Sequence, residues 1–146
     1  KNDLEMHHSQ NMIIQPFIDG DHYSLSVFFS NKNFRLLTIN KQNMDIKNCM
    51  MKLKSLIINV NRNLYLDILP IISNLQKSLP GLFGFVGIDF LLTGRDVYIV
   101  EINPRLTTSF AGLYETIGCN MIDLLINHKY IKNVITSREL CLSNNE

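Results

Sequence analysis

Residues 85–105 read FVGIDFLLTGRDVYIVEINPR, and this stretch decides the fold. Two apolar runs, residues 85–92 and 97–102, flank a Thr-Gly-Arg-Asp turn, which predicts a β-hairpin. Each run contains one acid, Asp89 in the first and Glu101 in the second. A carboxylate on a mostly buried strand costs several kcal/mol unless it is paired or binds a metal ion. Two such acids in consecutive strands therefore indicate a shared role.

The register of this hairpin decides whether the two acids meet. A three-residue loop, residues 94–96, would place Asp89 opposite Glu101, with the two Cβ atoms about 5 Å apart on one face. A two-residue loop would break this pairing. Asn103 lies two residues after Glu101 and therefore points to the same face. Two carboxylates this close repel unless a proton or a cation lies between them.

An oxygen-only set of ligands indicates a hard cation such as Mg²⁺ or Mn²⁺, and we predict that Asp89, Glu101 and Asn103 bind it. Two alternatives stay open for the acids. They could pair with lysine or arginine, or they could lie on a solvent-facing side of the sheet. Asn103 precedes Pro104 and could also serve only to end its strand as a turn-forming residue.

The residues after the second run add a cation and several hydroxyls. Arg105 is suited to hold a phosphate or a carboxylate through two parallel hydrogen bonds, so we predict a catalytic role for it. An ordinary ion pair with an acid of the cluster is the alternative. Residues 107–109, Thr-Thr-Ser, precede a predicted helix. They either cap this helix through Thr108 or Ser109, or they form an anion site at its start.

The remaining sequence predicts an α+β fold, with an antiparallel β-sheet and helices packed on one side. Alternating or apolar runs predict strands, and apolar faces at helical spacing predict helices. The predicted strands are 12–18, 23–29 and 34–39, with 56–60 as a further candidate, and the predicted helices are 64–79, 110–117 and 121–127. Pro70 lies inside the first of these helices, which either begins near it or kinks there.

Composition excludes several classes of function. The 146 residues fit one domain, and the net charge of +1 gives no electrostatic footprint for nucleic acid. No apolar run reaches the roughly 18 residues of a membrane span, and the first residues lack the apolar core of a signal peptide. The three cysteines are far apart and not in CxxC spacing, which favours reduced thiols in the cytoplasm. We therefore expect a cytoplasmic protein with no nucleic acid and no membrane partner.

The acidic hairpin also resembles a known family. Residues 87–90, GIDF, and residues 100–105, VEINPR, resemble the metal-binding end of the ATP-grasp superfamily. In that family an Asp on one strand and a Glu-x-Asn on the next hold two Mg²⁺ ions across the phosphates of ATP. The resemblance implies the same roles for Asp89, Glu101 and Asn103, and it implies ATP and Mg²⁺ or Mn²⁺ as cofactors.

A second stretch resembles the hinge of the same family. Residues 15–20, QPFIDG, match the segment that contacts adenine, so the resemblance implies that Gln15, Phe17 and Ile18 border the base. Lys41 and Gln42 end a predicted strand and could reach phosphate or ribose, although a solvated lysine is the alternative for Lys41. His22 stands where the family often carries an acid, so a ribose contact there is one interpretation and a surface histidine on a strand is the alternative.

The resemblance implies an activity. The run EINPRLTTSFAGL is similar to that of carboxylate–amine ligases related to tyramine–glutamate ligase. In this chemistry a substrate carboxylate attacks the γ-phosphate of ATP and becomes an acyl phosphate, which an amine converts into an amide. Two alternatives stay open: a non-catalytic nucleotide-binding, metal-binding or interaction module with the same fold, and a metal-dependent hydrolase, which would need a well-placed base.

The resemblance also sets an expected organisation. We expect a tail at residues 1–11, the C-terminal ATP-grasp subdomain at 12–132 and a weakly ordered segment at 133–146. The family's N-terminal part supplies phosphate-binding lysines, and nothing before Met12 matches it. The chain is therefore expected to be inactive alone and to need the N-terminal half of the same protein, and a homodimer is left open.

Overall fold

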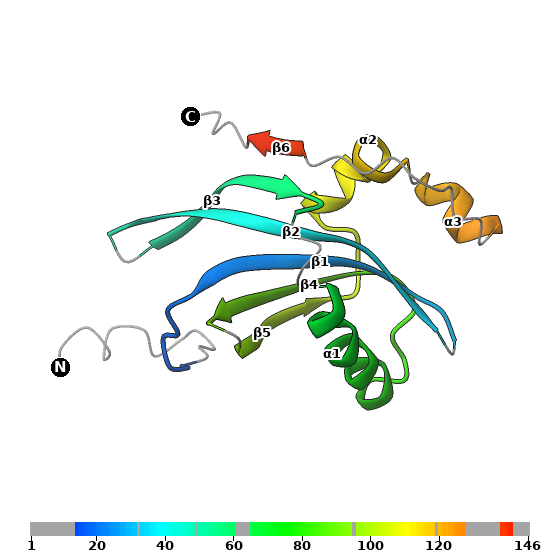
Figure 1. Ribbon diagram of the computed structural model, residues 1–146, viewed down its shortest axis with the longest axis horizontal. Helices are drawn as coiled ribbons and strands as arrows, with labels where there is room; N and C mark the ends of the chain where they lie inside the picture. Colours follow the sequence, from blue (N-terminus) through cyan, green and yellow to red (C-terminus); the bar gives the residue numbers. More distant parts are fainter. Residues whose placement is uncertain are drawn as a thin grey trace, which may run out of the picture.

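A computed structural model describes residues 14–31, 33–48, 50–60, 65–94, 96–118, 120–127 and 138–141. Within these residues the core is an antiparallel sheet in the order β5-β4-β1-β2-β3-β6. Its strands are β1 (Asp21–Phe29), β2 (Phe34–Lys47), β3 (Met50–Ile58), β4 (Gly84–Thr93), β5 (Asp96–Asn103) and β6 (Arg138–Cys141) (Figure 1). The expected tail at 1–11 lies outside the described residues, as does most of the segment 133–146.

The central strand β1 is buried on both faces. Seven consecutive residues, from Tyr23 to Phe29, are buried, which a strand achieves only when both faces of its sheet are covered. Leu25 and Val27 belong to one core cluster, whereas Phe28 belongs to a second cluster on the opposite face. The sheet therefore needs a cover on each side.

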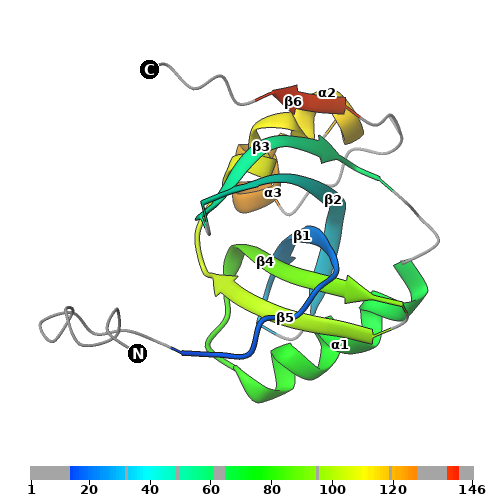
Figure 2. The ribbon, with the colours of Figure 1, turned by 90° about the vertical axis from the view of Figure 1, so that its left-hand side faces the viewer.

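Helices supply both covers. α1 (Tyr65–Ser78) packs Ile68 and Ile72 into the first core, and η3 (Thr108–Gly112), α2 (Leu113–Ile117) and α3 (Met121–Asn127) cover the second. Figure 2 shows α1 below the sheet and α2 and α3 in the upper half of the molecule. The α+β class is confirmed, but the expectation that the helices pack on one side is wrong. Its cause is the doubly buried β1, which cannot leave one face to solvent.

One predicted strand needs correction, and two others are longer than predicted. Residues 14–18 of the predicted strand 12–18 are not in a strand, because β1 already pairs with β2 on one edge and with β4 on the other. The predicted strand 34–39 continues to Lys47 as β2, and the candidate strand 56–60 is the end of β3, which begins at Met50 and ends at Ile58. The predicted helix at 64–79 is confirmed as α1, which includes Pro70. No helix in the described part of the chain is long and apolar enough to cross a membrane.

Candidate functional site

The hairpin of β4 and β5 brings the two acids together, although not by the predicted route. Thr93 pairs with Asp96, so the connection is shorter than the three-residue loop that the prediction required. A β-bulge between Asp89 and Phe90 then shifts the register, and Asp89 pairs with Glu101. The predicted pairing is confirmed, but the prediction that a short loop would break it is wrong. Val100 is the extra residue that restores it.

This bulge also decides which way Glu101 points. Val97 and Ile99, before the bulge, pack against the core on the α1 side, and so does Ile102 after it. Without the extra residue, the alternation of side chains between the two faces of β5 would point Glu101 and Asn103 into that same core. The extra residue reverses the alternation, so both side chains face the opposite side, where Asp89 lies. Glu101 is exposed there and Asn103 is buried, with 7% exposure.

Amide donors hold both carboxylate oxygens of Asp89. Gln42 on β2 donates from Nε2 to Oδ1 at 2.9 Å, and Asn103 on β5 donates from Nδ2 to Oδ2 at 3.3 Å. β1 lies between β2 and β4, and its residue opposite Asp89 is the small Ser24, over which Gln42 can reach. The carboxylate is thus fixed in orientation by neutral groups rather than by a cation, which disfavours the ion-pair alternative for Asp89.

Burial raises the pKa of Asp89 above its ordinary value. The hydrogen bond from Gln42 acts against this rise, the neighbouring Glu101 adds to it, and Arg105 opposes it. Desolvation thus outweighs the hydrogen bond, as expected for a half-buried carboxyl group.

This raised pKa predicts a pH-dependent stability in the metal-free chain. The folded chain binds the Asp89 proton more tightly than the unfolded chain, so the stability that it contributes is present at low pH and is lost as pH rises through the folded pKa. Asp89→Asn removes this titrating group. We expect it to raise the free energy of unfolding, relative to wild type, more at neutral pH than near about pH 4. Urea unfolding with chelator at both pH values checks this. Equal effects at both would contradict it, and Asp67→Asn on the exposed surface of α1 is the control.

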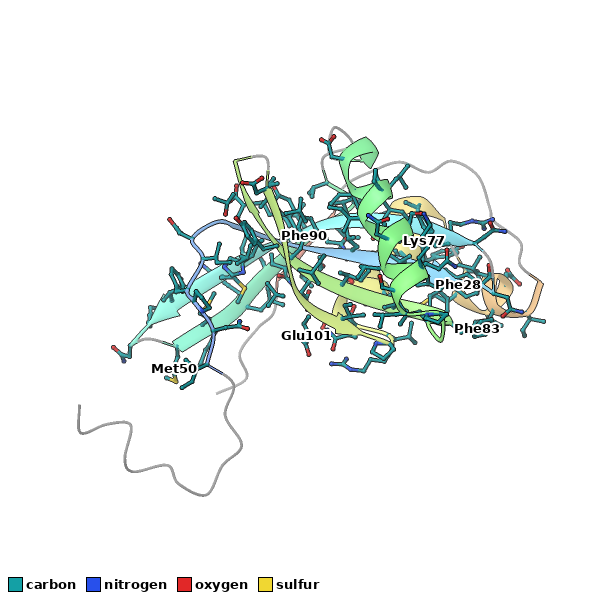
Figure 3. All side chains as sticks on the ribbon, turned by 90° about the horizontal axis from the view of Figure 1, so that it is seen from below. Phe28, Met50, Lys77, Phe83, Phe90 and Glu101 are labelled. Atoms are coloured by element: carbon teal, nitrogen blue, oxygen red, sulfur yellow. The ribbon has the colours of Figure 1, made fainter. Side chains whose placement is uncertain are left out.

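The acids open onto two adjoining cavities. The first has a volume of about 190 Å³. It is lined by carboxylate, amide, guanidinium and hydroxyl groups, from Ser24, Gln42, Asp89, Glu101, Asn103, Arg105, Thr107, Thr108 and Ser109, with Leu53 and Leu56. The second measures about 280 Å³, is mostly apolar, and shares Gln42, Leu53 and Asp89 with the first. A larger cavity, about 660 Å³, is lined by Phe28 and Phe83 at the end of the molecule away from Glu101 (Figure 3).

The loop after β5 forms one side of the first cavity. Thr107, not Thr108 or Ser109, precedes η3, and it makes no side-chain capping bond, so the capping alternative is wrong. Its hydroxyl instead lies 3.1 Å from that of Ser109. Thr107 packs directly onto Gly87 of β4, where an added Cβ would lie 2.5 Å from its Cγ2. Gly87 is therefore needed for the loop to approach the sheet.

Arg105 is one of the residues that line the first cavity. Its backbone N–H donates to the carbonyl oxygen of Asn103 at 2.7 Å, and its Nη1 donates to that of Leu106 at 3.3 Å. These bonds fix the turn after β5 while the guanidinium stays exposed. No ion pair between Arg105 and Asp89 or Glu101 is formed in the described residues.

Other predicted site residues are not brought to the carboxylates. Lys41 pairs in register with Tyr23, on the opposite face from Gln42. Its Nζ lies 3.2 Å from a carboxylate oxygen of Asp21 and 5.8 Å from the centre of the Tyr23 ring. Gln15 and Phe17 are exposed in the segment before β1, and Ile18 is half-buried.

The predicted hinge is attached to the end of β4. Thr93 Oγ1 donates to the carbonyl oxygen of Asp19 at 2.7 Å. A Cβ on Gly20 would lie 2.9 Å from the backbone oxygen of Leu92, so only glycine allows this close approach. The segment thus enters β1 beside the hairpin that carries Asp89.

The sequence prediction gave Gln42 a possible phosphate or ribose contact but did not pair it with Asp89, to which it donates a hydrogen bond. Its strand continues well past the predicted end at residue 39, so its face could not be read from the apolar pattern.

Within the described residues no three His, Cys, Asp or Glu side chains lie together, and the cluster offers two carboxylates and one amide. Such a set would need further ligands, for example phosphate oxygens, to complete the shell of a hard cation.

Comparisons with known proteins agree with this geometry. The sequence model of the ATP-grasp domain matches residues 1–109. Tyramine–L-glutamate ligase from Methanocaldococcus jannaschii is 35% identical over 104 residues, which cover 71% of this chain and 32% of that protein. The enzyme of the same name from Methanocaldococcus fervens is 32% identical over 104 residues, covering 71% of this chain and 34% of that protein. The chain thus spans about a third of the length of these curated relatives.

Solved structures show the same fold. A protein from Archaeoglobus fulgidus assigned to the ATP-grasp superfamily aligns with a TM-score of 0.69 and 22% identity, over 86% of this chain and 40% of that chain. The L-amino acid ligase from Bacillus licheniformis aligns with a TM-score of 0.64 and 18% identity, over 80% of this chain and 31% of that chain. With its sequence match over residues 1–109 and its antiparallel sheet, the chain belongs to the ATP-grasp family.

Proposed function

We propose that the chain is part of an ATP-dependent carboxylate–amine ligase, with Asp89, Glu101, Asn103 and Arg105 at its centre. One observation carries this proposal. The bulged hairpin turns Glu101 and Asn103 away from the core and places them beside Asp89, in a polar cavity that Arg105 also lines. A bulge that turns two polar side chains toward a half-buried acid adds nothing to the packing of the apolar core, and it suits a ligand site.

The donor set fits Mg²⁺ or Mn²⁺. Asp89, Glu101 and Asn103 offer only oxygen ligands once the Asn103 amide turns its oxygen toward the ion, and hard cations prefer oxygen. Burial and the neighbouring Glu101 raise the pKa of Asp89, and Arg105 opposes this rise only in part, so a further positive charge beside the carboxylate would be favourable. A bound divalent ion would supply that charge and would neutralise the phosphate oxygens of ATP during phosphoryl transfer.

The proposed reaction has two balanced steps. A carboxylate oxygen of the first substrate attacks the γ-phosphorus of ATP, the bond to the β-phosphate oxygen breaks, and ADP leaves with the electron pair. The amine nitrogen then attacks the acyl carbon, phosphate leaves, and the nitrogen loses a proton to give the amide. The chain contributes alignment and charge. Arg105 would hold the carboxylate or the transferring phosphoryl group, since its guanidinium is exposed at the cavity edge.

The adenine base needs an apolar cavity next to the site that binds the phosphates. The second cavity meets this need, because Met44, Met51 and Val100 line it and it shares Asp89 and Gln42 with the first. His22, just after the predicted hinge, also lines this cavity, and in this proposal it would contact ribose. In this proposal Gln15, Phe17 and Ile18 border the base from the segment before β1. Lys41 would have to leave Asp21 to reach the nucleotide.

The curated relatives suggest which substrates to test first. Because two of them are tyramine–L-glutamate ligases, L-glutamate and tyramine are the first pair to test. The experiment is ADP release by the full-length protein, with ATP and Mg²⁺, in the presence and absence of each carboxylate and amine. Release that needs both substrates supports the proposal, and ATP hydrolysis that ignores both would favour a hydrolase instead. A cytoplasmic location is part of this proposal, since reduced thiols are the rule there.

A further inference from the structure

We propose that Asn40 fixes the direction of a buried hydroxyl chain that ends at Thr107, and so makes Thr107 a hydrogen-bond donor toward an anionic oxygen in the first cavity. The inference rests on the proposed function, in which that oxygen belongs to a carboxylate or a phosphate. Asn40 is fully buried, with 0% exposure, and lies on β2, from where Ser26 links it to Ser109 in the loop of residues 107–109. It is a positioning residue and does not itself touch a ligand.

The orientation of the Asn40 amide is fixed by the backbone. The N–H of Asn59 approaches Asn40 Oδ1 at 3.2 Å. A backbone N–H can only donate, so the atom that faces it must be the amide oxygen. The amide nitrogen must therefore face the other way, where it donates to Ser24 Oγ at 3.3 Å and to Ser26 Oγ at 3.2 Å.

The donated hydrogen bond at Ser26 sets the direction of the next two bonds. Ser26 is fully buried and its oxygen accepts from Asn40, so its own proton needs a buried acceptor. Within the described residues, Ser109 Oγ at 3.0 Å is that acceptor. Ser109 is 3% exposed and now accepts from Ser26, so its proton goes to Thr107 Oγ1 at 3.1 Å. Each hydroxyl is thus a donor toward the loop.

Thr107 is the end of this chain. Its oxygen accepts from Ser109, and its own proton is left to point into the cavity that the side chain lines. Gly87 provides the space that brings Thr107 against the sheet beside Asp89. Ser24, the other acceptor from Asn40, also lines this cavity and likewise keeps its proton for it. The cavity therefore presents two oriented hydroxyl donors, an arrangement that suits an anion.

The test measures binding of inorganic phosphate to the Mg²⁺-supplemented chain by NMR, followed at the backbone amides of residues 107–110. Thr107→Val keeps the shape but removes the proton, and we expect about tenfold weaker binding, as for a lost hydrogen bond to a charged group. Thr107→Ser keeps the hydroxyl and is expected to bind within about twofold of wild type. Asn40→Asp can only accept when ionised, so it should reverse the chain and weaken phosphate binding about as much as Thr107→Val does.

A double-mutant comparison separates this role from simple packing. Ser26→Ala breaks the chain, so it should weaken phosphate binding about threefold in wild type and have no effect in Thr107→Val. This arm keeps the inference testable if Asn40→Asp does not fold. The inference is overturned if Thr107→Val binds phosphate like wild type, if Ser26→Ala acts equally in both backgrounds, or if the amides of residues 107–110 do not respond to phosphate.

The two proposals fail separately. If phosphate binding depends on the Thr107 hydroxyl but ADP release does not depend on either substrate, the oriented anion site is supported and the ligase proposal is contradicted. If ADP release depends on both substrates but phosphate binding does not depend on the Thr107 hydroxyl, the ligase proposal is supported and the role of Asn40 is contradicted.

Discussion

Glu101→Gln is expected to lower substrate-dependent ADP release by the full-length protein about 1000-fold, because loss of about 4 kcal/mol of charge stabilisation gives that factor. Glutamine keeps the size of the side chain and removes its charge. Glu101 is exposed and paired across the strands with Asp89, so its loss leaves a single carboxylate to hold the cation. The turnover number at saturating ATP and substrates is the measurement.

The matched control for this variant is Asp67→Asn. Asp67 is also an exposed carboxylate, but it lies on α1, which covers the other face of the sheet. It is expected to retain the wild-type rate. Equal rates for Glu101→Gln and wild type would remove Glu101 from the mechanism and with it the metal site as proposed here.

The 146-residue chain alone is expected to release ADP about 10,000-fold more slowly than the full-length protein, or not at all, a factor that corresponds to roughly 5 kcal/mol of lost alignment. This expectation rests on the shape and exposure of the site. The carboxylates and Arg105 lie along one side of an open cavity, and Glu101 and Arg105 are both exposed to water. Phosphoryl transfer needs the nucleotide held from both sides and shielded from solvent.

The two proteins are compared in one assay at equal concentrations, with ATP, Mg²⁺ and the carboxylate and amine that the full-length enzyme accepts. Circular dichroism of the isolated chain controls for folding. Full activity in a folded 146-residue chain would show that it is a complete enzyme rather than one part of a ligase.

The acidic hairpin illustrates how far sequence reasoning reaches. Asp89 and Glu101 were conspicuous because each interrupts an apolar run, and the structure confirms that they pair. The bulge at Val100 could not be predicted, since the apolar residues on both sides of it fit a strand equally well. Only the positions of Val97, Ile99 and Ile102 against one core reveal that the alternation reverses between them.

Long-range pairing explains the other differences. Ile14 and Phe17 suggest a strand by composition, but both edges of β1 are occupied, and these side chains stay 83% and 77% exposed. The assignment of Gln42 to Asp89 depends on β1 lying between β2 and β4, an order that no local pattern contains. The helices on both faces follow from the same central position of β1.

The most direct test of the central claim is Mn²⁺ binding to the chain by calorimetry, for wild type, Asp89→Asn and Glu101→Gln, with Asp67→Asn as the control. The cluster offers few protein ligands, so wild-type binding is expected to be weak but measurable. Each site variant is expected to bind at least about tenfold more weakly, a difference of about 1.4 kcal/mol, and the control is expected to match wild type. Equal Mn²⁺ affinity in wild type and Glu101→Gln, or no binding by wild type, would contradict the metal site at Asp89, Glu101 and Asn103.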